Sequence, residues 1–192
     1  MMTLGYDVRE PVVAASWTKE RRGAFLIRPD VLQPLSVDHL VWPHPVEIPA
    51  EVSPLPLWGS VSEARNAFAD TGTEAPLVIE IALADITGIG HNWTHAFEGM
   101  LHPEMDRWLH LDFHEYGYDV ADRYLTSGLS NCMLSAEEME AVRPRWVRRV
   151  NDYGLLSKPA DATEFAMVCD ANVPEHAPFF AYRLRCVLIS HP

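Results

Sequence analysis

Two pairs of histidines have a spacing that could bind a metal ion. His91 and His95 are four residues apart, and so are His110 and His114. On a helix, residues four apart lie on one face, so each pair could present two imidazoles to a zinc ion, as zinc hydrolases require. The segment HLDFHE matches neither H-E-x-x-H nor H-x-x-E-H, and nine histidines in 192 residues also produce such pairs by chance. We therefore expect no metal, and keep metal-assisted hydrolysis as an alternative that requires all four imidazoles to meet.

Other motifs of catalysis and nucleotide binding are missing from the sequence. It contains no G-x-S-x-G, no P-loop and no G-x-G-x-x-G; Gly88-Ile-Gly90 follows an expected strand but lacks the third glycine. The three cysteines are an odd number without C-x-x-C spacing, which indicates reduced core thiols. Arginines 143, 145, 148 and 149 surround Trp146, and they could either bind phosphate or form a solvated helix end.

A helix and two further strands are expected around a central strand. Pro76–Ile86 alternates large apolar residues with smaller or polar ones, which predicts a strand with one face toward a core. Just before it, residues 60–69 predict a short helix that begins at an N-cap, Ser60 or Ser62, and ends at Thr71-Gly72. The C-terminal segment Glu164–Ser190 predicts two more strands, in which Phe165, Met167 and Cys169, and then Phe180, Tyr182 and Leu184, are buried.

The remaining chain divides into an N-terminal third and a helical segment. Strands are expected at Pro11–Trp17, Gly23–Arg28 and Leu57–Gly59, with a proline-rich wrap over 29–56. Helices are expected at 92–100, 104–114 and 119–127, and from Ser135, where S-x-x-E forms a capping box. We therefore predict one α+β domain over residues 1–192 with a mixed, largely antiparallel sheet: strands, wrap and central strand in 1–86, helices in 87–158 and C-terminal strands in 159–192.

The order of these segments resembles the ADP-ribosyltransferase-like superfamily over about half of the chain. The segments concerned are FLIR at 25–28, LWGS at 57–60 leading into the helix, the strand at 77–86, and TEFAMV at 163–168. In that superfamily an early strand ends in Arg or His, a second ends in Ser or Tyr beside the nicotinamide pocket, and a late strand begins with the catalytic Glu. The resemblance implies an NAD-dependent transferase that modifies a macromolecule.

Each site residue follows from its position in that resemblance. Arg28 would hold the diphosphate or ribose of NAD, Ser60 would stand by the nicotinamide ribose, and Glu164 would stabilise the oxocarbenium-like state as nicotinamide leaves. A carboxylate near the developing cation and an arginine on phosphate suit that chemistry. Ala162 stands two residues before Glu164, where many members carry a Glu or Gln that directs the acceptor, so the sequence departs from the pattern there.

Charge supports a different hypothesis, that of an interaction protein. The chain carries 27 acidic and 15 basic residues, a formal net charge of −12, which argues against binding to nucleic-acid backbone. An acidic surface fits solubility, a basic protein partner or mimicry of nucleic acid. The alternative is thus a small acidic inhibitor, of phage or mobile-element type, that occludes a basic protein partner. The sequence begins without a signal peptide and has no membrane span, so we expect a cytoplasmic protein.

Overall fold

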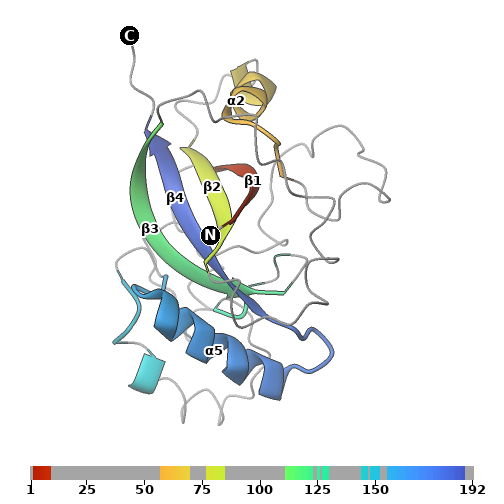
Figure 1. Cartoon of the computed structure of the whole chain (residues 1–192), viewed down its shortest axis with the longest axis vertical. Helices are drawn as coiled ribbons and strands as arrows, with labels where there is room; N and C mark the ends of the chain where they lie inside the picture. Colours follow the sequence, from red (N-terminus) through yellow and green to blue (C-terminus); the bar gives the residue numbers. More distant parts are fainter. Residues whose placement is uncertain are drawn as a thin grey trace, which may run out of the picture. The chain divides into compact units, whose positions relative to one another are not determined.

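The computed structural model describes residues 2–9, 57–69, 77–84, 111–122, 125, 127–129, 144–146, 148–151 and 155–188 (Figure 1). These residues fall into two compact units. Unit 1 contains those up to Tyr116 together with those from Arg183 onward, and unit 2 contains those from Gly117 to Tyr182. Two strands, β3 and β4, contribute residues to both units.

The described residues form an antiparallel sheet with the strand order β1-β2-β4-β3 (Figure 1). The strands are β1 (Met2–Arg9), β2 (Leu77–Leu83), β3 (Asp112–Ala121) and β4 (Phe180–Leu188). Two helices accompany them, α2 (Val61–Ala69) and α5 (Pro159–Asn172). The predicted α+β class and the largely antiparallel sheet are confirmed.

Strand β2 confirms the predicted central strand. Ile79, Ile81 and Leu83 are fully buried, as the alternation requires, but the opposite face with Val78 and Glu80 is buried as well. β2 is also paired along both edges, since it lies between β1 and β4. The sequence did not predict β1, which pairs antiparallel with β2 and sets Tyr6 opposite Glu80.

A glycine lets the chain approach β1 closely. Gly5 has φ +157, and a Cβ built there would lie 2.8 Å from Cβ of Leu57 and 2.9 Å from the carbonyl oxygen of Trp58. Tyr6 and Trp58 exchange two backbone hydrogen bonds beside it, of 2.9 and 2.8 Å. The predicted strand Leu57–Gly59 is therefore a single bridge, and only a residue without a side chain fits opposite it.

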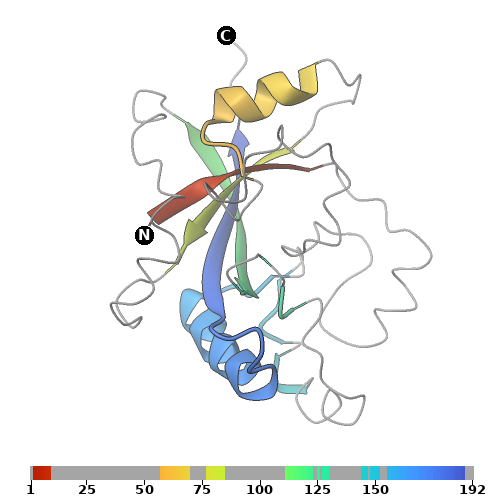
Figure 2. The ribbon, with the colours of Figure 1, turned by 90° about the vertical axis from the view of Figure 1, so that its right-hand side faces the viewer.

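Helix α2 begins where the sequence predicts. The Oγ of Ser60 accepts a hydrogen bond of 3.2 Å from the backbone N–H of Glu63, which confirms Ser60 as the N-cap. Val61 and Ala64 turn one face of the helix toward the sheet, and Figure 2 shows α2 alongside β1. The core cluster that results contains Tyr6, Val61, Ala64, Val78 and Val187, with Trp58, Leu111 and Phe113 packed against it.

Strand β3 replaces two predicted helices. The segment 112–121 is extended, so the helices expected at 104–114 and 119–127 are wrong over these residues. Aromatic and β-branched side chains such as Phe113, Tyr116 and Val120 favour a strand and outweigh the helix signals. Gly117 has φ +131, and a Cβ there would come within 2.8 Å of the carbonyl oxygen of Leu156, so this position also requires glycine.

Helix α5 stands where a strand beginning with Glu164 was predicted. Its buried residues, Ala162, Phe165, Ala166 and Cys169, follow helical spacing. Met167, expected to be buried, is 69% exposed because residues two apart point in different directions on a helix. A proline stands at the first turn, a position that suits the start of a helix. The second C-terminal strand is confirmed as β4, with Phe180, Tyr182 and Leu184 buried.

Several predicted elements lie outside the described residues. These are the strands at 11–17 and 23–28, the proline-rich wrap over 29–56, the Thr71-Gly72 end of α2, the helix at 92–100 and most of the helix from Ser135. Residues 144–146 of that last region are helical. None of the helices in the described part of the chain is both long and apolar enough to cross a membrane.

The central strand can be tested by placing a charge in it. Ile81→Asp buries a carboxylate without a partner in a fully buried position, and we expect it to lower the free energy of unfolding by roughly 4 kcal/mol or more. Urea denaturation followed by circular dichroism measures the change. Met167→Asp, at an exposed position, is the matched control and should stay within about 0.5 kcal/mol of wild type. Near-wild-type stability of Ile81→Asp would contradict the placement of β2.

Candidate functional site

Two of the three residues expected to bind NAD belong to different units. Ser60 belongs to unit 1, where its hydroxyl caps α2, and Glu164 belongs to unit 2, in the first half of α5. Arg28 lies outside the described residues. Glu164 therefore lies in a helix, and the prediction that it begins a strand is wrong. The resemblance itself stays a prediction.

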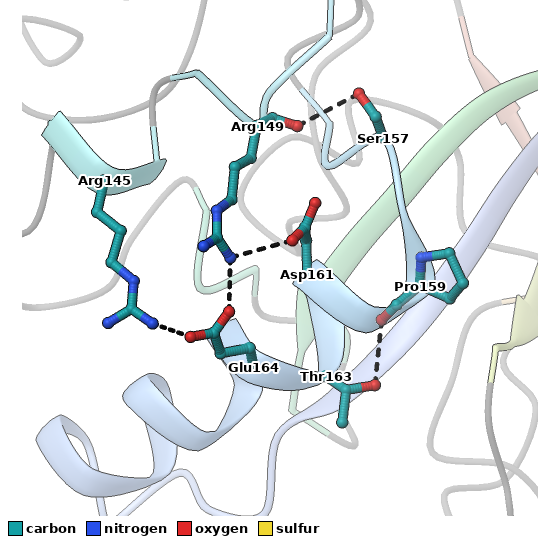
Figure 3. A network of polar contacts seen from close by, with 7 residues as sticks. All are labelled: Arg145, Arg149, Ser157, Pro159, Asp161, Thr163 and Glu164. Carbon is teal, nitrogen blue, oxygen red and sulfur yellow. Dashed lines mark hydrogen bonds and ion pairs between the residues drawn. The ribbon is translucent and has the colours of Figure 1, made fainter.

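Glu164 is held by two arginines (Figure 3). One carboxylate oxygen pairs with Arg145, and the other lies 2.5 Å from Nη1 of Arg149. The same nitrogen of Arg149 lies 3.0 Å from Oδ1 of Asp161, one turn earlier on α5. The charge of Glu164 is thus compensated inside the protein, whereas a residue that stabilises an oxocarbenium-like ligand needs its charge directed at that ligand.

Trp146 lies beneath these arginines. Its ring is fully buried, edge-on to Phe165 with 4.9 Å between ring centres. The guanidinium carbons of Arg149 and Arg145 lie 4.7 and 5.3 Å from its ring centre, within the range of a cation–π contact. Of the arginines that could bind phosphate or form a solvated helix end, these two form internal contacts and Arg148 is exposed. These ion pairs and ring contacts hold α5 against residues 144–151.

The two arginines should differ in their effect on stability. Arg149 pairs with two carboxylates and its side chain is 30% exposed, whereas Arg145 pairs with one and is 57% exposed. We expect Arg149→Met to lower the free energy of unfolding by about 1 kcal/mol and Arg145→Met by less than about 0.5 kcal/mol, because solvent screens exposed pairs. Urea denaturation in 0.1 M and 1 M NaCl checks this, and the difference should shrink at high salt. If both variants lose the same free energy of unfolding at each salt concentration, the prediction that Arg149 contributes more than Arg145 is contradicted.

A second polar cluster is buried in unit 2. Asp119, Asp122 and Ser127 have almost no exposed surface. Oδ1 of Asp119 accepts hydrogen bonds from the Ser127 hydroxyl (2.8 Å) and from the backbone N–H of Val120 (2.7 Å). The Ser127 hydroxyl oxygen in turn accepts from the N–H of Leu129 at 3.1 Å. These bonds hold the turn after β3 against the strand.

The same cluster orients a histidine. Nδ1 of His176 lies 3.0 Å from Oδ2 of Asp122, and their side chains are 33% and 2% exposed. A carboxylate acceptor favours the tautomer with its proton on Nδ1, which leaves Nε2 able to accept a proton. Sequence reasoning missed this acid–base arrangement, because 54 residues separate the partners and no motif contains them. Within the described residues, no contact of His176 with a nucleophile is seen, so the pair by itself anchors the loop after α5.

Tyr182 completes the cluster. Its hydroxyl donates a hydrogen bond of 3.0 Å to the carbonyl oxygen of Asp122. Burial raises the pKa of Tyr182 well above its usual value, and the charges of Asp122 and Asp119 raise it further. The phenol therefore remains neutral at physiological pH and serves as a donor.

The raised pKa predicts how stability changes in alkali. Because the folded state binds the phenolic proton more tightly than the unfolded state, whose pKa is near 10.0, this stabilisation is present below pH 10 and is lost as the pH rises above it. Urea denaturation between pH 8 and 11 should show an added decline of up to about 1.4 kcal/mol per pH unit. Tyr182→Phe should remove this added decline, and Tyr118→Phe, the matched control, should retain it. Equal slopes in wild type and Tyr182→Phe would contradict the prediction.

The histidine pairs gain no support in the described residues. His114 is exposed on β3, edge-on to Tyr116 with 5.4 Å between ring centres. Since 112–121 is a strand, the helical spacing that would align His110 with His114 does not apply to the second half of that segment. His91, His95 and His110 lie outside the described residues. Within the ranges that the structure describes, no three or more His, Cys, Asp or Glu side chains are placed to hold a metal ion.

A buried carboxylate on β2 forms the third polar cluster, in unit 1. Glu80 accepts hydrogen bonds at both oxygens from Arg185 on β4, with Nη2 to Oε1 at 2.8 Å. The Thr3 hydroxyl of β1 also donates to Oε1, at 2.9 Å. Burial alone would lower the pKa of Arg185, but the hydrogen bond and charge of Glu80 raise it above its usual value. Arg185 therefore stays ionised, and the hydrogen bonds of this cluster join three strands.

Comparisons with known protein families, with curated proteins and with solved structures returned no match. The fold and the three polar clusters are therefore the basis for any statement about function. Of these clusters, those around Glu164 and Glu80 are built from ion pairs, and the one around Asp122 is built from neutral donors and an imidazole.

Proposed function

We propose that the protein is a small acidic cytoplasmic interaction protein that binds a basic protein partner without catalysis. The observation that carries this proposal is the distribution of charge. The chain has a net charge of −12, and three of its arginines, Arg149, Arg183 and Arg185, are turned inward to carboxylates.

Other carboxylates face outward in the described part of the protein, and of these Glu115 also lies 3.7 Å from Nη1 of Arg183. Exposed acidic side chains occur on α2, at both ends of the first half of β3, and after α5: Glu63, Asp112, Glu115 and Glu175. The described residues also expose Arg65, Arg145, Arg148 and Lys158, so the support for a negative outer field is the net charge of −12 over the whole chain. Such a field attracts a cationic protein, speeds the encounter and repels nucleic-acid phosphate.

The NAD-dependent transferase has less support and stays a prediction. Both oxygens of Glu164 contact arginines, and the hydroxyl of Ser60 accepts a bond from its own helix. NAD binding at Glu164 would have to displace these ion pairs. A basic partner requires no such rearrangement.

Binding to defined peptides tests the proposal. We expect the purified chain to bind a 20-residue peptide rich in Arg and Lys, and to ignore an acidic peptide of equal apolar content. Fluorescence anisotropy at 50 and 300 mM NaCl should show binding that weakens at least tenfold at high salt. A quadruple variant, Glu63→Gln, Asp112→Asn, Glu115→Gln and Glu175→Gln, should bind several-fold more weakly, because it removes four exposed charges.

Two controls separate charge-driven binding from apolar contact and from NAD binding. Met167→Ser changes an exposed side chain without changing charge and should bind the basic peptide as wild type does. Equal binding of basic and acidic peptides, or full affinity in the quadruple variant, would contradict the proposal. Thermal melting with millimolar NAD forms a separate test: a rise in Tm that Glu164→Gln abolishes would favour the transferase instead.

A further inference from the structure

Arg183 on β4 is a largely buried cation whose hydrogen bonds are incomplete. Its side chain is 14% exposed. Nη2 lies 3.4 Å from Oε2 of Glu80, and Nη1 lies 3.7 Å from Oε1 of Glu115. Within the described part of the chain, its Nε is buried and has no acceptor. A guanidinium has five N–H donors, so contacts with the described residues use only part of its capacity.

Arg185, two residues along the same strand, has more complete hydrogen bonds than Arg183. Arg185 presents its Nε and Nη2 side to the two oxygens of Glu80, and its guanidinium carbon lies 3.5 Å from the ring centre of Phe113. Thr3 adds another donor to the same carboxylate. Glu80 is therefore already bonded at both oxygens and can offer Arg183 only a long contact.

The charges of this cluster do not cancel where they are buried. Glu80, with 4% of its side chain exposed, contributes one negative charge, while Arg183 and Arg185, at 14% and 20%, contribute two positive charges. Glu115 could compensate the excess, but its side chain is 54% exposed and 3.7 Å exceeds hydrogen-bond distance. The buried trio thus contains one more positive than negative charge, and the exposed carboxylate of Glu115 on β3 offsets this excess from the solvent side.

We propose that Arg183 anchors an oxyanion site on this sheet face and binds a carboxylate or phosphate group of a ligand. The planar guanidinium fork matches both groups, and one added negative charge balances the trio. Because Arg185 bonds both oxygens of Glu80, this carboxylate competes little with a ligand for Arg183. The ring of Phe113 provides an apolar edge to the site. This site is independent of the proposed basic partner, and it differs from the NAD site, which the resemblance places at Arg28, Ser60 and Glu164.

Thermal melting of the full chain with simple anions tests the site. At constant ionic strength set with NaCl, millimolar inorganic phosphate or acetate should raise Tm saturably by several degrees. A larger effect of phosphate identifies a phosphate ester as the ligand class, and a larger effect of acetate identifies a carboxylate. Arg183→Met should abolish the rise and leave Tm in anion-free buffer little changed, because it removes a poorly bonded charge.

Two further variants complete the design. Arg183→Lys keeps the charge but loses the planar fork, and should weaken the apparent affinity for the anion at least tenfold. Arg148→Met, at an exposed arginine of unit 2, should retain the full rise. The proposal is overturned if wild type shows no anion-specific rise, if Arg183→Met retains it, or if Arg183→Met fails to fold or melts far lower, since a purely structural role would give that last result.

Discussion

The Glu80 carboxylate, buried in the middle strand of the sheet, is the constraint on which unit 1 depends. Moving an ionised carboxylate out of water costs several kcal/mol unless a cation and further donors surround it. Arg185 meets that requirement, and it can do so only when β4 lies next to β2. The ion pair thus links residues 105 positions apart in the sequence. It favours this strand order over others that would bury the same apolar side chains.

Unit 2 stabilises its carboxylates in two different ways. Asp161 and Glu164 lie at the surface of α5 and pair with Arg149, which also packs over Trp146. Asp119 and Asp122 lie deeper and use a hydroxyl, a backbone N–H and an imidazole. The hydroxyl and the backbone N–H are neutral donors, and they avoid the cost of burying a second charge.

Local sequence patterns correctly predicted the elements in which the apolar pattern or the capping residue agrees with the burial found in the fold. β2 and β4 alternate, and α2 has a serine that caps it, so sequence alone placed all three. The first half of the C-terminal segment carries two patterns at once: Phe165, Met167 and Cys169 alternate, yet Phe165 and Cys169 also stand four apart. Packing chose the helix, with Pro159 in its first turn as the signal that favoured it. β1 and β3 carry polar residues and were missed, because partners distant in sequence determine that they pair.

The polar clusters could not be predicted for the same reason. Their burial also determines over what distance their charges act. Glu80 and Arg185, or Asp122 and His176, have no motif that joins them, so only the fold brings them together. Salt limits the reach of exposed charges to about 8 Å at physiological ionic strength, while buried charges are screened much less. In the proposed function an acidic surface acts on an approaching partner from outside, whereas the site proposed at Arg183, which is mostly covered, acts only on a group in direct contact. A protein with a strong negative charge can for this reason favour cationic partners at a distance and still hold one anion at a buried arginine.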